Sequence, residues 1–274
     1  MFLGDFIDRG PDSRGVCTLA RAMVEDGQAL AVMGNHELNA LAYHTKHPDK
    51  PDEYLRPRNE KNTKQHRDTL ESFNGHDAEL EDALRWFGTL PLWLDRGDLR
   101  VIHAAWHEPS LTVLSGELED GNVLPLAALP AATTKGGKLF TAVETILKGV
   151  EVPLPDNLTF RDKDNHLRTE VRIKWWEAEP GMSWRDVALG DSQLTKQLSD
   201  DPAQLHQAYT YPAKAPPVFI GHYWRTGTPA PLARNVACLD YSVARKGGSL
   251  VAYRWDGERQ LLKERFVSVP RADE

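Results

Sequence analysis

Two short apolar segments, each followed directly by a polar loop, constrain this chain more than any other feature. The first opens the chain and runs into Gly4-Asp5-Phe6-Ile7-Asp8-Arg9-Gly10, and the second, residues 29–33, runs into Gly34-Asn35-His36-Glu37. We expect both segments to be buried strands joined by a helix, because Asp5 and Asn35 are 30 positions apart, about the length of one βαβ unit. A right-handed crossover makes such strands parallel, so both polar loops should meet at the sheet edge where ligands bind.

The segment between the two loops predicts the connecting helix. Asp12 or Ser13 can cap its start, and Gly27 is placed to end it. The apolar residues between them recur with helical spacing and predict one buried face, formed by Val16, Leu19, Ala20, Met23 and Val24.

The rest of the first half alternates helical and strand patterns. Residues 38–43 predict a short helix, and residues 44–68 a solvated loop that carries exposed His44, His47 and His66. A second helix is expected over 69–87, and a core strand over 99–102 that ends at His103.

The last quarter of the chain predicts further strands. Residues 217–220 lead into Gly221-His222, and residues 236–240 end in Asp240. Two alternating runs, 250–255 and 260–267, flank Asp256-Gly257, a dipeptide typical of β-hairpin turns.

Residues 108–216 differ in amino-acid composition from the segments on either side. They hold Gly/Ala/Pro-rich stretches, a polar run over 161–168 and three tryptophans, Trp175, Trp176 and Trp184. We expect this stretch to be an insertion or cap within a single domain spanning 1–274, placed over the sheet edge and able to select the substrate. Its tryptophans either stack a nucleobase or form a local core, and the sequence favours neither.

Composition narrows the class of protein. An apolar content of 41% and a charged content of 27% are those of a globular protein, and 274 residues suffice for one large α/β domain. A net charge of −7 makes nucleic acid an unlikely partner and argues against an anionic membrane surface. The apolar stretches are too short to span a membrane, and no signal-peptide pattern precedes the first motif. Two cysteines, Cys17 and Cys238, are expected as buried thiols, which favours a cytoplasmic location.

Four polar residues have the same position relative to a predicted strand. Asp5, Asn35, His103 and His222 each follow an apolar run at the expected end of a strand. One such histidine is more often a core residue than a ligand, but four residues so placed favour a metal site. Carboxylate, amide and imidazole ligands suit a divalent ion such as Mn, Fe or Zn. Asp5 has two oxygens and could bridge two ions, which lie about 3.5–4 Å apart in two-metal hydrolases.

The two N-terminal loops carry a resemblance to a known family. Gly4-Asp5-Phe6-Ile7-Asp8-Arg9-Gly10 and Gly34-Asn35-His36-Glu37 resemble the GDxxDRG and GNHE motifs of calcineurin-like metallophosphoesterases. Because the first motif contains an arginine, Arg9, the chain resembles the branch of the family that includes Ser/Thr phosphoprotein phosphatases and symmetrical diadenosine tetraphosphatases. Val101-Ile102-His103-Ala104 and Gly221-His222 match more weakly but in the family's order. The resemblance covers 1–107 and 217–267, and it implies a layered α/β sandwich of two mixed β-sheets flanked by helices.

The resemblance also implies a role for each motif residue. Asp5 would bridge two metal ions, and Asn35, His103 and His222 would complete the second site. A metal-bound hydroxide would attack phosphorus, and His36, held by Asp8, would protonate the leaving group. Arg9 would grip the phosphoryl oxygens.

Two departures from the family pattern affect the first metal. The family's D-x-H motif and the strand that bears it are missing, so we expect that the natural protein starts upstream. In addition, Gly221-His222 is followed by Tyr223-Trp224, where many relatives carry a second metal-binding histidine. We therefore expect two divalent ions in a full-length form and one in this chain.

The expected function is metal-dependent hydrolysis of phosphomonoesters, including phosphoprotein. The first alternative is a dinucleoside polyphosphate hydrolase, so the substrate is a phosphoprotein, a small phosphoester or a nucleotide. A non-catalytic module that binds phosphate or metal is the alternative from another class. Three further residues are weaker candidates near the same edge: Arg225 for the substrate, and Asp240 and Tyr241 as supports for the ligands.

Overall fold

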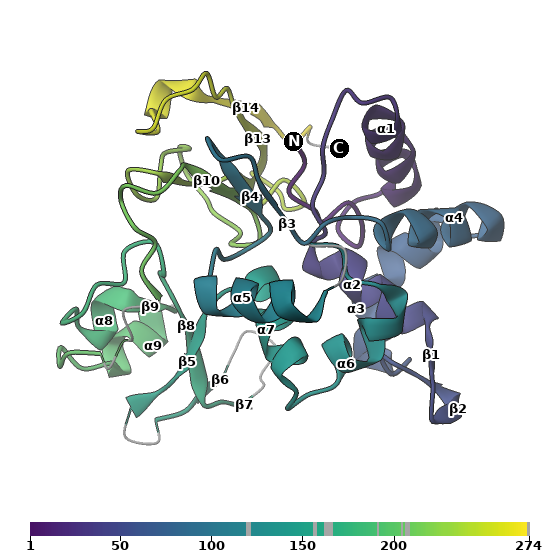
Figure 1. Ribbon diagram of the computed structural model, residues 1–274, viewed down its shortest axis with the longest axis horizontal. Coiled ribbons are helices and arrows are strands. Elements are labelled where there is room, and N and C mark those ends of the chain that lie inside the picture. Colours follow the sequence, from purple (N-terminus) through teal and green to yellow (C-terminus); the bar gives the residue numbers. More distant parts are fainter. Residues whose placement is uncertain are drawn as a thin grey trace.

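The computed structural model describes residues 1–118, 122–155, 158–161, 167–190, 192–203, 205 and 209–272. It confirms the α/β fold class, with sheets covered by helices (Figure 1). The central sheet is mixed: β10 runs parallel to both of its neighbours, and β3 pairs antiparallel with β4. Its order is β11 (Val236–Cys238), β10 (Val218–Ile220), β4 (Arg100–Ile102) and β3 (Trp93–Asp95).

The two N-terminal apolar segments pair in parallel, as the sequence predicts. Phe2 N–H donates to Leu30 O at 2.8 Å, and Val32 N–H donates to Phe2 O at 3.1 Å. The pairing is a single bridge rather than a long ladder, because Gly4 and Asp5 have φ of +83° and +60° and turn the chain. Both polar loops therefore begin at the same edge.

The connecting helix α1 (Ser13–Glu25) begins as predicted, with Asp12 Oδ1 accepting Gly15 N–H at 2.8 Å. Its predicted apolar face is largely wrong, since Leu19 is 65% exposed and Val16 and Met23 are exposed too. The buried face consists of the small residues Ser13, Cys17 and Ala20, with Val24 packed beside them. This face lies toward α3 and α4.

The region after the second loop holds more structure than predicted. Helix α2 (Asn35–His44) starts at Asn35 rather than residue 38, and the expected loop contains a hairpin of β1 (Lys46–His47) and β2 (Lys50–Tyr54). The expected helix over 69–87 is wrong as a single element. It is replaced by α3 (Glu60–Ser72) and α4 (Asp77–Phe87), because Gly75 between them has a φ of +76°.

A second, antiparallel sheet closes the chain and consists of β12 (Asp240–Tyr241), β13 (Ser249–Tyr253) and β14 (Phe266–Pro270). The predicted hairpin is present, since β13 and β14 pair antiparallel, but its second strand begins at Phe266 rather than at residue 260. Tyr253 pairs with Phe266, so residues 254–265 form a long connection. Glu258 organises it by accepting Tyr253 O–H at 2.6 Å and Asp256 N–H at 2.8 Å.

The central sheet separates two cores. On one face, Val101, Phe219 and Ala237 pack with Tyr253 and Phe266 of the second sheet. Alternate residues of the same strands, such as Ile102, Ile220 and Cys238, belong to the larger core shared with the helices. This alternation follows from the two-residue period of a strand, and it builds the layered arrangement that the resemblance implies.

Residues 108–216 supply the helices and small sheets below the central sheet in Figure 1. In order they form α5 (Glu108–Glu117), η1 (Leu126–Ala128), α6 (Leu129–Thr133), α7 (Lys138–Lys148), β5 (Glu151–Pro153), β6 (Phe160–Arg161), β7 (Leu167–Arg168), β8 (Glu170–Ile173), α8 (Trp184–Val187), β9 (Ala188–Leu189) and α9 (Ser192–Gln197). Trp175, Trp176 and Trp184 are buried in the larger core, which confirms the local-core interpretation. Most of the polar run over 161–168 lies outside the described residues.

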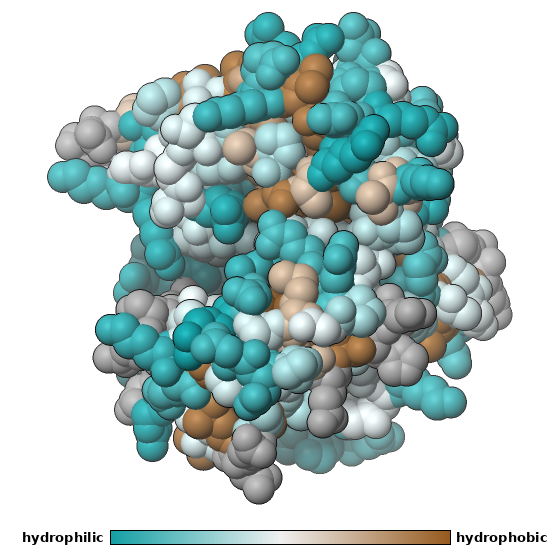
Figure 2. All heavy atoms as spheres, turned by 90° about the vertical axis from the view of Figure 1, so that its left-hand side faces the viewer, coloured by the Kyte–Doolittle hydropathy of each residue, from teal (hydrophilic) through white to brown (hydrophobic). Residues whose placement is uncertain are grey.

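The surface seen from the side of α8 and α9 is mostly hydrophilic, with hydrophobic side chains in small separate areas (Figure 2). Among the described residues, no helix combines the length and apolar character needed to cross a membrane. Cys17 and Cys238 are buried free thiols, as predicted.

Candidate metal centre and active site

Four loops deliver polar side chains to one edge of the central sheet. Asp5 follows the Phe2 bridge, Asn35 is the first residue of α2, His103 follows β4 and His222 follows β10. The structure brings these four predicted residues together. One ligand atom each from Asp5, His103 and His222 lies within 4.8 Å of the other two. Asn35 joins them, because its Oδ1 lies 3.1 Å from His103 Nε2 and 2.8 Å from His222 Nδ1.

The hydrogen-bond partners of His103 indicate that this cluster fits a cation. His103 Nδ1 donates to the carbonyl oxygen of Leu3 at 2.5 Å, so Nε2 is the ring atom that could bind a metal. Nε2 lies 3.1 Å from Asn35 Oδ1 and 3.4 Å from Asp5 Oδ1, so three potential ligand atoms meet at this point. Lone pairs that converge in this way suit a divalent metal, and a backbone carbonyl on the other ring nitrogen is usual for a metal-binding histidine.

His222 is also in the form that binds a metal. Burial, the neighbouring His103 and the guanidinium of Arg172 lower its pKa well below the ordinary value, so its ring is neutral. Arg172, on β8, places Nη1 3.4 Å from His222 Nε2, and its Nη2 donates to Glu151 at 3.0 Å. No pattern in the sequence singled out Arg172.

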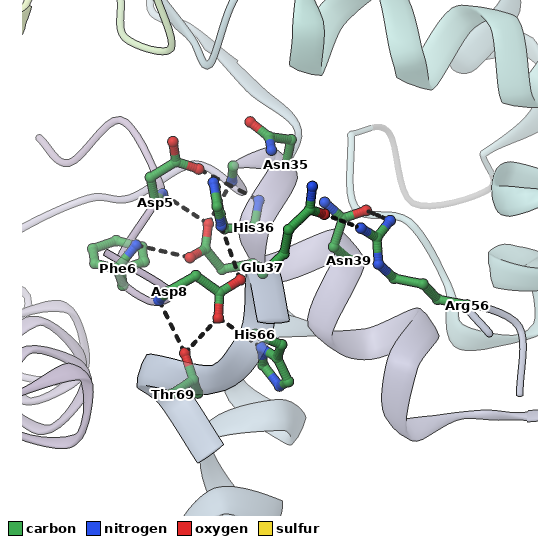
Figure 3. Close-up of polar contacts among 12 residues, drawn as sticks. Asp5, Phe6, Asp8, Asn35, His36, Glu37, Asn39, Arg56, His66 and Thr69 are labelled. Atoms are coloured by element: carbon green, nitrogen blue, oxygen red, sulfur yellow. Dashed lines mark hydrogen bonds and ion pairs between the residues drawn. The ribbon is translucent and has the colours of Figure 1, made fainter. Parts of the chain in front are cut away.

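Glu37 holds the two polar loops together and was not predicted as a site residue. Its carboxylate is fully buried and accepts three backbone N–H groups: those of Asp5 at 2.8 Å, Phe6 at 2.8 Å and Gly34 at 2.9 Å (Figure 3). Burial and the charge of Asp5 raise the pKa of Glu37 to about 7. The bond to Gly34 caps α2, and the other two fix the loop that carries Asp5.

Two glycines allow these loops to approach each other. A Cβ on Gly4 would lie 2.4 Å from Gly34 N, and a Cβ on Gly34 would lie 2.5 Å from Asp5 N. The glycine that opens each motif is therefore required by backbone contact.

His36 and Asp8 form a buried pair beside the metal-binding cluster. His36 Nδ1 donates to Asp8 Oδ2 at 2.9 Å. Burial alone would lower the pKa of His36, but the carboxylates of Asp5 and Asp8 outweigh burial and raise it. Burial alone would likewise raise the pKa of Asp8, but hydrogen bonds from His36 and His66 hold it well below its usual value. The pair therefore favours an imidazolium next to a carboxylate.

The remaining predicted residues lie on or beside the chain segment that follows His222. Arg9 is exposed, and its guanidinium lies 4.9 Å from the ring centre of Trp224. The guanidinium of Arg245 lies 4.2 Å from the same ring centre. Asp240 supports the loop after His222 by accepting Trp224 N–H at 3.0 Å. Arg225 Nε is buried without a hydrogen-bond partner among the described residues, and the hydroxyl oxygen of Tyr241 accepts Ala230 N–H at 3.1 Å.

The prediction that His66 lies exposed on a loop is wrong. His66 is a buried residue of α3 and donates to Asp8 Oδ1 at 2.6 Å, while His44 Nε2 lies 3.1 Å from His66 Nε2. His44, at the end of α2, and His47, in β1 of the hairpin, are half-buried rather than exposed, so the prediction is wrong for them too. The sequence held no apolar signal for this cluster, because its buried groups are polar.

The state of His44 predicts a pH dependence of stability. Burial and the positive charges of His66 and Arg58 lower the pKa of His44 to about 4. An unfolded histidine titrates near pH 6.5, so between about pH 6.5 and 4 the unfolded chain binds a proton that the folded chain does not. The free energy of unfolding must therefore fall as the pH falls through this window.

We expect His44→Gln to reduce the loss of stability between pH 7 and pH 5 by about 1 kcal/mol, after allowance for solvent screening at this partly exposed site. Urea unfolding of the metal-free protein at both pH values measures it, with His47→Gln as the control. An equal pH dependence in wild type and His44→Gln would contradict the assignment.

Comparisons with known proteins agree with the geometry. The calcineurin-like phosphoesterase family matches residues 1–180. The symmetrical bis(5'-nucleosyl)-tetraphosphatase of Ralstonia nicotianae (strain ATCC BAA-1114 / GMI1000) is 29% identical over 122 residues, which cover 43% of this chain and 38% of that protein. The match thus spans well under two thirds of the relative's length. The crystal structure of a candidate diadenosine tetraphosphatase aligns with 99% of this chain and 80% of its own at 14% identity, but its TM-score of 0.44 is too low to add to the assignment. Because the family match covers more than half of the sequence, the chain belongs to the calcineurin-like phosphoesterase family.

Proposed function

We propose that the chain is a metal-dependent phosphoesterase in which Asp5, Asn35, His103 and His222 hold a divalent ion, Mn, Fe or Zn. The convergence of these four side chains beside the His36–Asp8 pair carries the proposal. When bound, the ion supplies positive charge to the phosphoryl oxygens and activates the attacking water. The four residues account for one ion.

His36 is the general acid in this proposal. Its Nδ1 is committed to Asp8, so Nε2 remains to meet the leaving group. The raised pKa of His36 keeps a proton on Nε2 near neutral pH. That proton passes to the leaving-group oxygen as the P–O bond breaks, and the Asp8 carboxylate stabilises the imidazolium before transfer.

Two arginines are placed to bind the phosphoryl oxygens. Arg9 extends from the first loop, and Arg172 reaches the edge of the cluster from β8. The Nε–H of Arg172 is buried and has no hydrogen-bond partner among the described residues, so it remains able to donate. Guanidinium groups suit this task because they donate two parallel hydrogen bonds. We further propose that residues 108–216, which bring Arg172, are an insertion within a single domain that selects the substrate.

Phosphomonoesters, including phosphoprotein, are the substrate class that the His36–Asp8 pair supports best. An alkoxide is a poor leaving group and needs a proton, whereas a phosphate leaving group, with a pKa near 6, gains little from one. Dinucleoside polyphosphates are the second candidate, supported by the tetraphosphatase relative. A module that only binds phosphate would gain less from the His36–Asp8 pair than a hydrolase, because it has no leaving group to protonate.

Hydrolysis assays in Mn²⁺ test the proposal and separate the two substrates. We expect a higher kcat/KM for phenyl phosphate than for diadenosine tetraphosphate. His36→Asn should lower kcat for phenyl phosphate about 10²–10⁴-fold and should affect p-nitrophenyl phosphate less, because p-nitrophenolate leaves without full protonation. His47→Asn is the matched control. Preference for diadenosine tetraphosphate would favour the second candidate, and failure to hydrolyse any of these esters would reject both.

A further inference from the structure

The Asp8 carboxylate has two histidine partners, and the proposed chemistry uses only one. His36 occupies Oδ2 at 2.9 Å, and His66 occupies Oδ1 at 2.6 Å (Figure 3). His66 reaches Asp8 from α3, 58 positions along the chain. Asp8 and His66 are both buried, so the contact is built into the core rather than formed at the surface.

Oδ1 of Asp8 accepts a second hydrogen bond, from a hydroxyl group on the same helix α3. Thr69 Oγ1 donates to Asp8 Oδ1 at 2.6 Å and accepts Asp8 N–H at 2.9 Å. With Oδ1 occupied by two donors, the carboxylate is held in one rotation and Oδ2 is presented to His36. Asp8 also needs this support because its backbone has a φ of +72°, which is strained for a residue other than glycine.

The ring of His66 is fixed by a further histidine. His66 Nδ1 donates to an oxygen of the Asp8 carboxylate. His44 Nε2, at 3.1 Å from His66 Nε2, holds the far side of the ring, and Tyr43 packs against it with ring centres 5.0 Å apart. The ring nitrogen that donates to Asp8 is therefore held in place from the far side of the ring.

We infer that His66 is a positioning residue for the general acid: it acts through Asp8 to orient His36 toward the leaving group. This inference rests on the proposed function. His66 lines a small pocket with Asp8 and His36, and its hydrogen-bond partners among the described residues are Asp8 and His44 rather than any of the four cluster residues, so it is not a catalytic residue itself. If His66 positions His36, the ring atom from which it donates a hydrogen bond must matter. If His66 only packs, the size and shape of its side chain matter instead.

Two polar substitutions separate positioning from packing. His66→Asn places an amide N–H near the position of Nδ1, whereas His66→Gln places its amide near Nε2 and leaves Asp8 Oδ1 with Thr69 alone. We expect His66→Gln to lower kcat for phenyl phosphate about 10–100-fold, as loss of comparable supporting hydrogen bonds does. The loss for p-nitrophenyl phosphate should be several-fold smaller, and His66→Asn should retain most of the wild-type kcat on both substrates.

The double variant His36→Asn/His66→Gln shows whether His66 acts through His36. If it does, His66→Gln has no further effect once His36 is replaced. A full additional loss in the double variant, an equal loss on both substrates, or equal losses in His66→Asn and His66→Gln would overturn the inference.

A measurement without turnover distinguishes failure of this inference from failure of the proposed function. We expect the imidazole ¹⁵N signals of His36 in the metal-free protein to move in His66→Gln and to stay near wild type in His66→Asn. If the wild type hydrolyses no ester, the proposed function fails, but these spectra still decide the inference. Unmoved His36 signals in His66→Gln would then reject it.

Discussion

Asp5→Asn is expected to abolish metal-dependent hydrolysis while leaving the metal-free protein as stable as wild type or more so. The amide keeps the shape of Asp5, but it removes the charge that faces His103 Nε2 at 3.4 Å and that raises the pKa of buried Glu37. Loss of the anionic ligand should lower kcat/KM more than about 100-fold, since outer partners of metal ligands alone account for about 10–100-fold.

The effect of Mn²⁺ on thermal stability makes this prediction specific to metal binding. We expect Mn²⁺ to raise the thermal midpoint of the wild type, because an ion that binds only the folded state stabilises it. Asp5→Asn should show little or no rise, and Asp26→Asn, at the exposed end of α1, should behave as wild type. A Mn²⁺-dependent rise of wild-type size in Asp5→Asn would contradict the role of Asp5.

Glu37→Ala is expected to cause the largest loss of stability. It leaves three backbone N–H groups, those of Asp5, Phe6 and Gly34, without an acceptor in the interior. Each buried donor without a partner costs about 1–3 kcal/mol, so we expect a loss of at least about 3 kcal/mol in the free energy of unfolding. Urea unfolding of the metal-free protein measures it.

The matched control for this loss is an exposed glutamate. Glu25 pairs with Arg21 on the surface of α1, and Glu25→Ala should change stability by about 1 kcal/mol or less. If Glu37→Ala changed stability no more than Glu25→Ala, Glu37 would not be the residue that joins the two loops.

The meeting of the cluster residues was predictable because each follows an apolar run. Asp5 and Asn35 end the two arms of one βαβ unit, and His103 and His222 follow β4 and β10, which are parallel neighbours. Chain topology then brings all four to one edge without any information on side-chain contacts. Local pattern and topology together determine this part of the site.

Glu37 and His66 could not be found by the same reasoning. Helix α3 buries His66 and Thr69 while its other residues are mostly polar, so no apolar stripe marks its inner face. Its inner face is held by hydrogen bonds to Asp8, which hydrophobic periodicity does not register. Glu37 looks like an ordinary acidic residue in the first turn of a helix, and only the tertiary approach of the Asp5 loop gives it two further donors.

For helix α1, the apolar pattern predicted the helix correctly but misplaced its buried face. Its larger apolar residues follow a helical period but lie outward, and the small residues Cys17 and Ala20 lie inward. Close packing against α3 and α4 selects small side chains there, so size outweighs hydrophobicity at this face. A pattern that counts only apolar character therefore predicts the helix but assigns the wrong side.

The most direct test of the central claim is the anomalous scattering of Mn²⁺ in crystals of this chain. We predict one strong peak within about 2.0–2.3 Å of ligand atoms from Asp5, Asn35, His103 and His222, at distances usual for oxygen and nitrogen ligands. A Mn²⁺ peak elsewhere with none among these four side chains would contradict the account.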